Sequence, residues 1–320
     1  MRRLSLLVFA LAACALAHAQ GYPNRPVRMV VGFPPGGGTD VVARIIAPGL
    51  SENLGQPVVI ENRPGATGTV AAAMVAKSPA DGYTIMMGHV SVNAIAPSLF
   101  PDLPYDVQKD FAPVTLAASV PHFVVVHPSL PVHSIRELIA YAKERPGKLS
   151  FPSAGNGSTP HLAGEIFKSM AGVNLVHVPY KGSGQSMADL LAGQHQVAFD
   201  TAPASAGNVR SGRMRVLGVS SAKRIPEYPD VPTVAEAGVP GYEVITWYGV
   251  FAPGGTPAAI VARLHAETAK AMDTPVARAR LAEAGADGSV SRSPEEFAAI
   301  VRADTARYAR IIKDAGLKID

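Results

Sequence analysis

The sequence predicts an α/β protein of two lobes, in which each lobe is a mixed sheet flanked by helices and two strands form the hinge. Three observations support this fold class. The chain has 320 residues, which is more than a single hydrophobic core usually serves. Short β-branched runs alternate with amphipathic helical stretches, a pattern typical of sheets with crossover helices. The pattern also occurs twice, starting near residue 27 and again near residue 123.

The first half reads as a β-α-β-α-β unit with glycine-containing turns between its elements. The first strand runs directly into a series of glycines, which predicts a tight turn at the start of the first helix. We expect strands over residues 27–33, 58–61 and 83–87, and helices over residues 39–50 and 67–77.

The second half repeats this alternation. Ser134 is expected to cap a helix that extends to Arg145, with Glu137 at the capping-box position. The other expected elements are strands over residues 123–126, 149–151, 175–178, 197–199 and 215–219, and helices that end near residues 170 and 191.

The last part of the chain is helical after an apolar, strand-like run over residues 242–251. Three helices follow residue 257 and have no strands of their own to cover, so we expect them to pack on the first lobe. The chain would then cross between the lobes near Pro121 and near Tyr242. This assigns residues 20–121 and 247–320 to lobe 1, and residues 122–246 to lobe 2.

The N-terminus has the features of a cleavable export signal. Two arginines precede a short apolar segment over residues 4–16, and Ala17-His18-Ala19 matches a cleavage site. The apolar run is shorter than the roughly 20 residues that span a bilayer. We therefore expect residues 1–19 to be removed and the protein to be periplasmic. The alternative is a lipoprotein anchored through Cys14, because the four residues that end there resemble a lipobox.

The composition excludes several classes of protein. Cys14 is the only cysteine, so the mature chain has no disulfide, thiol nucleophile or cysteine-bound zinc. The formal net charge is +4 with scattered basic residues, so nucleic acid is not an expected partner. The histidines beyond the signal show no H-x-x-x-H or H-E-x-x-H spacing, and we expect them at the surface or at helix caps. No metal site and no cofactor are predicted.

The strongest local signal is a glycine-rich turn between a strand and a helix, Phe33-Pro34-Pro35-Gly36-Gly37-Gly38-Thr39-Asp40. It lacks both the lysine of a phosphate-binding loop and the spacing of a dinucleotide fingerprint. Such a turn presents backbone N–H groups at a helix N-terminus, where one small anion can bind. Asp40 would disfavour a trianion, and we expect it to accept hydrogen bonds from a ligand hydroxyl or ammonium group. The alternative is a structural turn in which Thr39 or Asp40 caps the helix.

A second turn of the same design occurs in the other half, Ser153-Ala154-Gly155-Asn156-Gly157-Ser158-Thr159. Two helix N-termini that face each other across a cleft would hold a carboxylate or dicarboxylate by backbone N–H groups. Residues after other strands should lie at the same sheet edge, where open α/β sheets bind ligands. These further candidates are Gly88, His89, Ser91, Tyr180, Lys181 and Asp200.

A catalytic function finds little support in the sequence. No G-x-S-x-G elbow occurs, and no pair of acids is placed for general acid–base work. The alternative that stays open is a secreted hydrolase or isomerase on the same clamp, with Ser158, His161 and Asp200 as its candidate groups.

Short motifs are spread along the whole chain. They are Tyr22-Pro23-Asn24-Arg25-Pro26, Pro35-Gly36-Gly37-Gly38-Thr39-Asp40, Glu61-Asn62-Arg63-Pro64-Gly65-Ala66, Ala80-Asp81-Gly82-Tyr83-Thr84, Leu103-Pro104-Tyr105-Asp106, Lys109-Asp110-Phe111, His161-Leu162, His177-Val178-Pro179-Tyr180-Lys181-Gly182, Asp230-Val231-Pro232-Thr233 and Ala252-Pro253. Together these motifs resemble those of the Bug family, the extracytoplasmic receptors of tripartite tricarboxylate transporters. The resemblance implies a periplasmic-binding-protein-like clamp (type II-like) without catalysis. It also implies that Phe33, residues 35–40 and residues 153–159 hold a ligand carboxylate.

The expected function is therefore capture of a small organic acid for a membrane transporter. The ligand would be a mono- or dicarboxylate, which includes amino and aromatic acids, and the partners would be the permease subunits of a tripartite tricarboxylate-type system. The protein is expected to be a monomer. A ligand-loaded sensor that docks on a signalling receptor is the alternative, since both roles use the same closed clamp.

Overall fold

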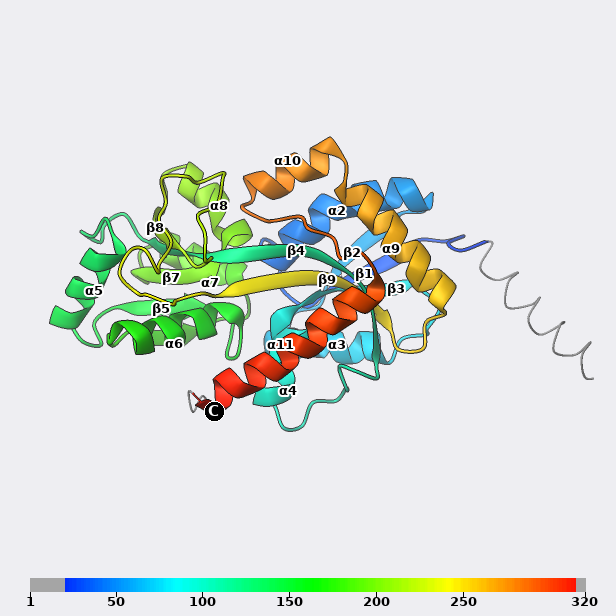
Figure 1. Ribbon diagram of the computed structural model, residues 1–320, viewed down its shortest axis with the longest axis horizontal. Helices are drawn as coiled ribbons and strands as arrows, with labels where there is room; N and C mark the ends of the chain where they lie inside the picture. The colour runs from blue at the N-terminus through cyan, green and yellow to red at the C-terminus, as the bar shows by residue number, and fades with distance from the viewer. Residues whose placement is uncertain (1–20, 315–320) are drawn as a thin grey trace, which may run out of the picture.

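The computed structural model describes residues 21–314 of the chain. The predicted export signal, its cleavage site and Cys14 lie outside these residues. Short strands and helices alternate through the described chain, as the sequence predicts, and the fold is α/β with helices flanking the sheets (Figure 1).

The elements follow in chain order. They are β1 (Val27–Val31), α2 (Gly38–Leu54), β2 (Val58–Asn62), η1 (Ala66–Gly68), α3 (Thr69–Ala76), β3 (Thr84–His89), the π-helical η2 (Ser91–Ile95), α4 (Ala96–Leu99), β4 (Phe111–Val126), α5 (Ile135–Glu144), β5 (Ser150–Ser153), α6 (Thr159–Ala171), β6 (Val176–Pro179), α7 (Ser183–Leu191), β7 (Val197–Thr201), α8 (Ala202–Arg210), β8 (Arg215–Val219), β9 (Ile245–Pro253), α9 (Ala258–Met272), α10 (Pro275–Glu283) and α11 (Pro294–Asp314).

The main sheet is mixed and has the strand order β2-β1-β3-β9-β4-β7, with β8 also paired to β4. β1 is parallel to β2 and β3, whereas β9 is antiparallel to both β3 and β4. β7 and β8 are antiparallel to β4, and β5 and β6 form a separate parallel pair. The predicted mixed-sheet class is confirmed.

β4 and β9 run side by side along the middle of the molecule and connect its two ends (Figure 1). The first part of β4 pairs with β9, ending at the pair Pro121–Ile245, and the part from His122 onward pairs with β7 and β8. The predicted lobe boundaries, at 121/122 and 246/247, fall inside these two strands.

β4 begins twelve residues before the strand that the sequence predicts. Prolines at positions 113 and 121 argue against a strand, because proline cannot donate to the ladder. The structure accommodates this stretch with shifts in register between Pro113 and Thr115 and between Leu116 and Ala118. Helix α8 and the π-helical turn η2 were also not expected from the sequence.

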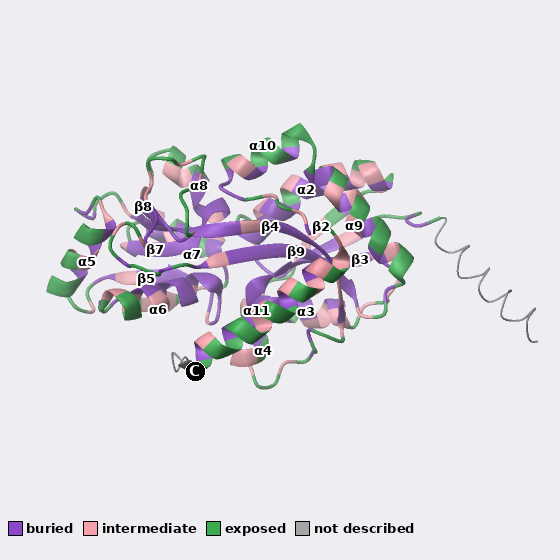
Figure 2. Ribbon diagram, in the orientation of Figure 1, coloured by how far each residue is buried: buried purple, intermediate pink, exposed green. Residues whose placement is uncertain are grey.

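Alternate residues of the central strands enter different hydrophobic clusters. Met29 packs with residues of α2 and α9, while its neighbour Val30 packs with residues of α3 and α11. In β4, Val124 packs with α5 and α6, and Phe123 packs with α7 and α8. Because side chains alternate across a strand, helices cover both faces of the sheet at each end, and the strands are largely buried (Figure 2).

The three C-terminal helices pack on the end of the molecule that holds β1 to β3, as predicted. α9 and α10 contact α2, and α11 contacts η2, α4 and β4. Between residues 21 and 314, no helix has the length and apolar character needed to cross a membrane.

Candidate ligand-binding cleft

The first glycine turn connects β1 to an uncapped helix N-terminus. Gly37 is the N-cap residue of α2, and no side chain there bonds to the first N–H groups of the helix. Gly36 has a φ of 84°, which favours glycine, and its N–H donates to Asp40 Oδ2 at 3.0 Å. Gly37, Gly38 and Thr39 line a small cavity, so the positive end of the α2 dipole faces an enclosed space.

Asp40 does not face this cavity, in contrast to the sequence-based expectation. Its Oδ2 also accepts from Arg44 Nε at 2.9 Å, and its Oδ1 accepts from Asn62 Nδ2 at 2.9 Å. Burial raises the pKa of Asp40, but the hydrogen bonds from Arg44, Gly36 and Asn62 outweigh burial and lower it overall. Both oxygens are thus occupied and the charge is paired, so Asp40 stabilises the turn and is not open to a ligand hydroxyl or ammonium group.

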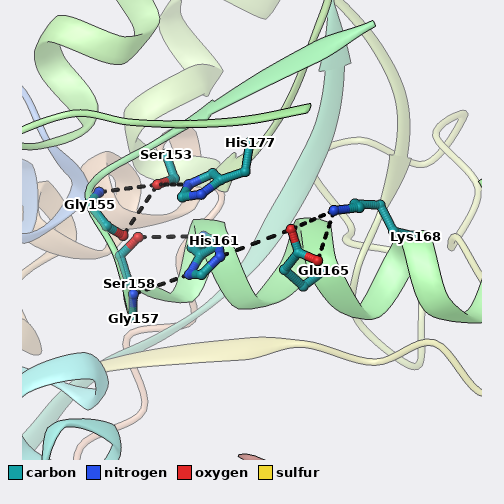
Figure 3. Close-up of polar contacts among 8 residues, drawn as sticks. All are labelled: Ser153, Gly155, Gly157, Ser158, His161, Glu165, Lys168 and His177. Atoms are coloured by element: carbon teal, nitrogen blue, oxygen red, sulfur yellow. Dashed lines mark hydrogen bonds and ion pairs between the residues drawn. The ribbon is translucent and has the colours of Figure 1, made fainter. Parts of the chain in front are cut away.

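The second turn differs from the first because it uses its own N–H groups. Gly155 N donates to Ser153 Oγ at 3.1 Å, and Ser158 N donates to Gly155 O at 3.1 Å. Gly157 N donates to His161 Nδ1 at 3.1 Å (Figure 3). Thr159 N donates to Ser91 Oγ at 3.0 Å. The expected symmetric pair of open helix N-termini is therefore not present in this conformation. The second turn instead presents Ala154 and the Ser158 side chain to the cavity.

Two stacked histidines support the second turn. The rings of His161 and His177 lie 3.9 Å apart and almost parallel, and His177 Nε2 bonds Ser153 Oγ at 2.7 Å (Figure 3). Burial lowers the pKa of both rings, and for His177, with help from His161 and Lys168, to about 3. Two neutral rings can stack without charge repulsion, so this pair is suited to holding the turn rigid.

The three groups considered for a hydrolase do not form a catalytic unit. Ser158 Oγ accepts from the backbone N–H of His161 and is not bonded to its ring. His161 Nδ1 accepts from a backbone N–H, and Asp200 bonds Ser183 and Thr201 instead of a histidine. A serine nucleophile needs the ring of a base within hydrogen-bond reach, which this arrangement does not supply.

The cavity at the α2 N-terminus has a volume of about 20 Å³, which is room for roughly one water molecule. Seven of its wall residues are predicted from the sequence. Ser183, Thr201, Tyr248 and Pro160 are not, because they lie on α7, β7, β9 and α6 and meet only through the tertiary fold. The lining residues are Phe33, Gly37, Gly38, Thr39, His89, Ala154, Ser158, Pro160, Ser183, Thr201 and Tyr248.

His89 has a defined protonation state in this wall. It is buried, contrary to the expectation of a surface or capping histidine, and lies between the rings of Phe33 and Tyr248. Its Nδ1 accepts from Ser91 N at 2.9 Å, so the neutral ring carries its proton on Nε2. Burial, aided by the nearby His122, lowers the pKa of His89 to about 3. Among residues 21–314, Nε2 has no hydrogen-bond partner and is free to donate to a ligand.

Asp200 lies behind the opposite wall. Its Oδ1 accepts from Thr201 N at 2.6 Å and from Ser183 Oγ at 3.0 Å, and both of these partners line the cavity. Its Oδ2 is buried and has no hydrogen-bond partner in the described chain. Burial raises the pKa of Asp200 to about 6 in spite of these bonds.

A larger chamber of about 610 Å³ lies on the other side of Phe33. The expected candidates Gly155, Tyr180 and Lys181 line it, together with the strained turn at Ala66 and Thr67, both of which have positive φ. Most of its lining is not predicted from the sequence. The lining residues are Gly32, Phe33, Pro64, Gly65, Ala66, Thr67, Gly68, Phe100, Gly155, Asn156, Pro179, Tyr180 and Lys181.

Hydrogen bonds join the two sides of the cleft. Thr67 Oγ1 donates to Asn156 O at 2.8 Å, and Thr159 N donates to Ser91 Oγ at 3.0 Å. Several expected ligand-binding residues line neither space. They are Pro35, Gly36, Asp40, Gly88, Ser91, Ser153, Gly157, Thr159 and Asp200.

Comparison with known proteins identifies the family. A family model described as the tripartite tricarboxylate transporter family receptor matches residues 42–317. The chain belongs to this family. It is 37% identical to Protein BugT of Bordetella pertussis, over 99% of this chain and 98% of that protein. The resemblance to the Bug family is thereby confirmed, and receptors of this family are periplasmic solute-binding proteins.

Two of the solved structures that resemble this chain were determined with an organic acid. An R. palustris protein solved with adipate is 43% identical, with a TM-score of 0.90 over 93% of this chain and 99% of that one. MatC from Rhodopseudomonas palustris, solved with bound malate, is 35% identical, with a TM-score of 0.85 over 91% of this chain and 100% of that one. Both similarities extend over almost the whole described fold.

Proposed function

We propose that this protein is a periplasmic receptor that captures a small organic acid and delivers it to the membrane subunits of a tripartite tricarboxylate-type transporter. The observation that carries the proposal is the α2 N-terminus, where Gly37, Gly38 and Thr39 face a cavity and no side chain caps the helix. Unpaired N–H groups and the helix dipole favour a carboxylate there. His89 Nε2–H and the Ser158 hydroxyl add donors from two other elements.

The two spaces on either side of Phe33 suggest how the acid is held. The cavity at the α2 N-terminus, here called the inner cavity, suits one carboxylate after a small separation of its walls. The larger chamber on the other side of Phe33, here called the outer chamber, has room for the rest of the acid. Lys181 provides a cation in the outer chamber, and Tyr180 is fixed there by bonds to Asp189 and His195, each of 2.7 Å. A mono- or dicarboxylate fits this division, whether its body is aliphatic, aromatic or that of an amino acid.

The proposal also covers how the chain is exported and processed. Residues 1–19 would direct export and be cleaved, which leaves a free periplasmic monomer and not a lipoprotein attached through Cys14. Intact-mass measurement of the native mature protein checks this point. A diacylglycerol-modified Cys14 at the N-terminus would contradict it.

A thermal-shift screen of organic acids tests ligand binding. An acid at a hundredfold excess over its Kd should stabilise the folded protein by about 2.7 kcal/mol and raise its Tm. Gly37→Val should abolish that rise, since Gly37 lines the cavity and its added side chain would point towards Ser183. The fold should tolerate this change, because Gly37 has a φ of −77°, which any residue adopts.

Gly207→Val in α8 is the matched control, because its added side chain meets no atom within 4 Å. This variant should keep the ligand-induced rise in Tm. If a folded Gly37→Val protein still responds fully to the acid, the ligand site lies elsewhere. A response confined to sugars, metal ions or nucleotides would refute the carboxylate proposal.

A further inference from the structure

The walls of the inner cavity differ in hydrogen-bonding character. On one side, the α2 N-terminus and His89 Nε2 are donors. On the other side stands the hydroxyl of Ser183, whose proton is directed at Asp200 Oδ1 at 3.0 Å. A hydroxyl that donates elsewhere presents its oxygen lone pairs to its remaining neighbours. The Ser183 side of the cavity is therefore an acceptor surface, which repels a carboxylate oxygen and suits an O–H or N–H group.

Asp200 gives the Ser183 side of the cavity its hydrogen-bond-acceptor character. Its side chain is buried at the end of β7, with Oδ2 unpartnered, and no cation pairs with it among residues 21–314. The titratable groups near it are Tyr248 from β9, whose pKa burial raises, and His122 from β4, which burial keeps neutral. α7 contributes the serine hydroxyl and no charge at this point. The carboxylate thus holds the Ser183 proton without competition from a positive group.

We propose that Asp200 positions the Ser183 hydroxyl so that the site selects acids with a hydrogen-bond donor next to the carboxylate. Asp200 is thus a specificity-determining positioning residue, and this inference rests on the proposed carboxylate site. These are 2-hydroxy and 2-amino acids. The carboxylate takes the donors of α2 and His89, and the neighbouring hydroxyl or ammonium group donates to Ser183 Oγ. The corresponding acid without this hydroxyl or ammonium group leaves the Ser183 oxygen without a partner in the cavity wall, which lowers its affinity.

Two matched acids, malate and succinate, provide the test, because they differ only in the 2-hydroxyl group. Their Kd values are measured by calorimetry at pH 8, where both acids are ionised and Asp200, with a pKa of about 6, is ionised as well. The wild-type protein should bind malate about tenfold more tightly than succinate, the value of one buried hydrogen bond. The pair lactate and propionate, and the pair aspartate and succinate, should show the same order.

The variants separate this role from a structural one. Ser183→Ala removes the acceptor, so malate should weaken about tenfold while succinate binding persists. Asp200→Asn removes the charge, so malate should weaken and succinate should bind as well as before or better. Ser186→Ala is the matched control, because Ser186 is buried in the same helix and donates to Ser183 O without lining the cavity. It should leave the malate-to-succinate ratio unchanged.

Three results would overturn the inference. Equal affinities for the members of each pair in the wild-type protein would remove the selection itself and leave the carboxylate site intact. A ratio that survives both Ser183→Ala and Asp200→Asn would place the selecting group elsewhere. The third result has two parts: the two acids of each pair bind equally, and both bind more weakly as pH rises in the wild-type protein but not in Asp200→Asn. It would show that Asp200 takes up a proton when the acid binds, instead of holding the Ser183 proton so that Ser183 accepts from the ligand. Failure of every acid to bind at any pH would instead refute the proposed function.

Discussion

Gly38 and Tyr248 pack against each other in the cavity wall so closely that the position of Tyr248 depends on the small size of Gly38. A Cβ atom on Gly38 would overlap the Tyr248 hydroxyl oxygen and approach Thr201 Oγ1 to 2.6 Å. Gly38 is therefore required for close approach of α2 to β9, and not for an unusual φ. The sequence shows three consecutive glycines, but it does not show that they serve different purposes.

Gly38→Ala should lower both stability and ligand affinity. Overpacking of this kind costs about 1–3 kcal/mol, which urea unfolding will measure. Combining it with Tyr248→Phe removes the worst overlap, so the double variant should recover part of the lost stability. Gly207→Ala, which meets no atom within 4 Å, is the control and should be neutral or slightly stabilising. Additive losses in the double variant would contradict the close contact.

Two helices begin with the same kind of cap but have different surroundings. Ser134 Oγ accepts from Glu137 N at 3.2 Å at the start of α5, as the sequence predicts. Ser158 Oγ accepts from His161 N at 3.4 Å at the start of α6. Ser134 lies far from the cleft along the chain, whereas Ser158 lines the inner cavity. The pair therefore separates the structural value of a cap from its value in ligand binding.

Ser134→Ala and Ser158→Ala should each reduce stability by about 1 kcal/mol, since each removes an N-cap. The ligand-induced rise in Tm should persist in Ser134→Ala and fall in Ser158→Ala, because the second variant also loses a donor to the ligand. Thermal unfolding with and without the acid measures both effects. An equal ligand response in the two variants would show that the Ser158 hydroxyl does not contact the ligand.

At the scale of the whole molecule, the sequence predicts what local patterns determine. β-Branched runs locate most strands, and the first glycine turn leads to the wall of the inner cavity. The sequence does not reveal groups that meet only after folding. Ser183, Thr201 and Tyr248 come from three elements far apart in the chain, and nothing local distinguishes them. Nor does the spacing of Asp40 show that Arg44 and Asn62 occupy its carboxylate.

Buried histidines make the stability of the whole molecule depend on pH. His122 and His89 are both buried, and burial lowers their pKa values to about 4 and about 3 from an ordinary value of 6.5. The pKa of His177, lowered to about 3, acts in the same direction. These pKa values are lower in the folded state, so the unfolded chain binds more protons below pH 6.5. Stability should therefore fall as pH decreases from 6.5 towards 4. Asp200 acts in the opposite direction, because its pKa is raised to about 6, and it offsets part of this loss.

His122→Gln should reduce this pH dependence. Each neutral buried histidine contributes roughly 1.4 kcal/mol per pH unit within its window, so the variant should lose about 2–3 kcal/mol less than the wild-type protein between pH 6.5 and 4.5. Urea unfolding at several pH values measures the slope, which is more informative than the absolute stability, since glutamine also changes the bonds to Val244 and Thr246. His133→Gln, at an exposed position, should keep the wild-type slope. If His122→Gln and the wild-type protein lose stability in parallel, His122 is not the group that resists protonation, and the acid sensitivity arises from other residues.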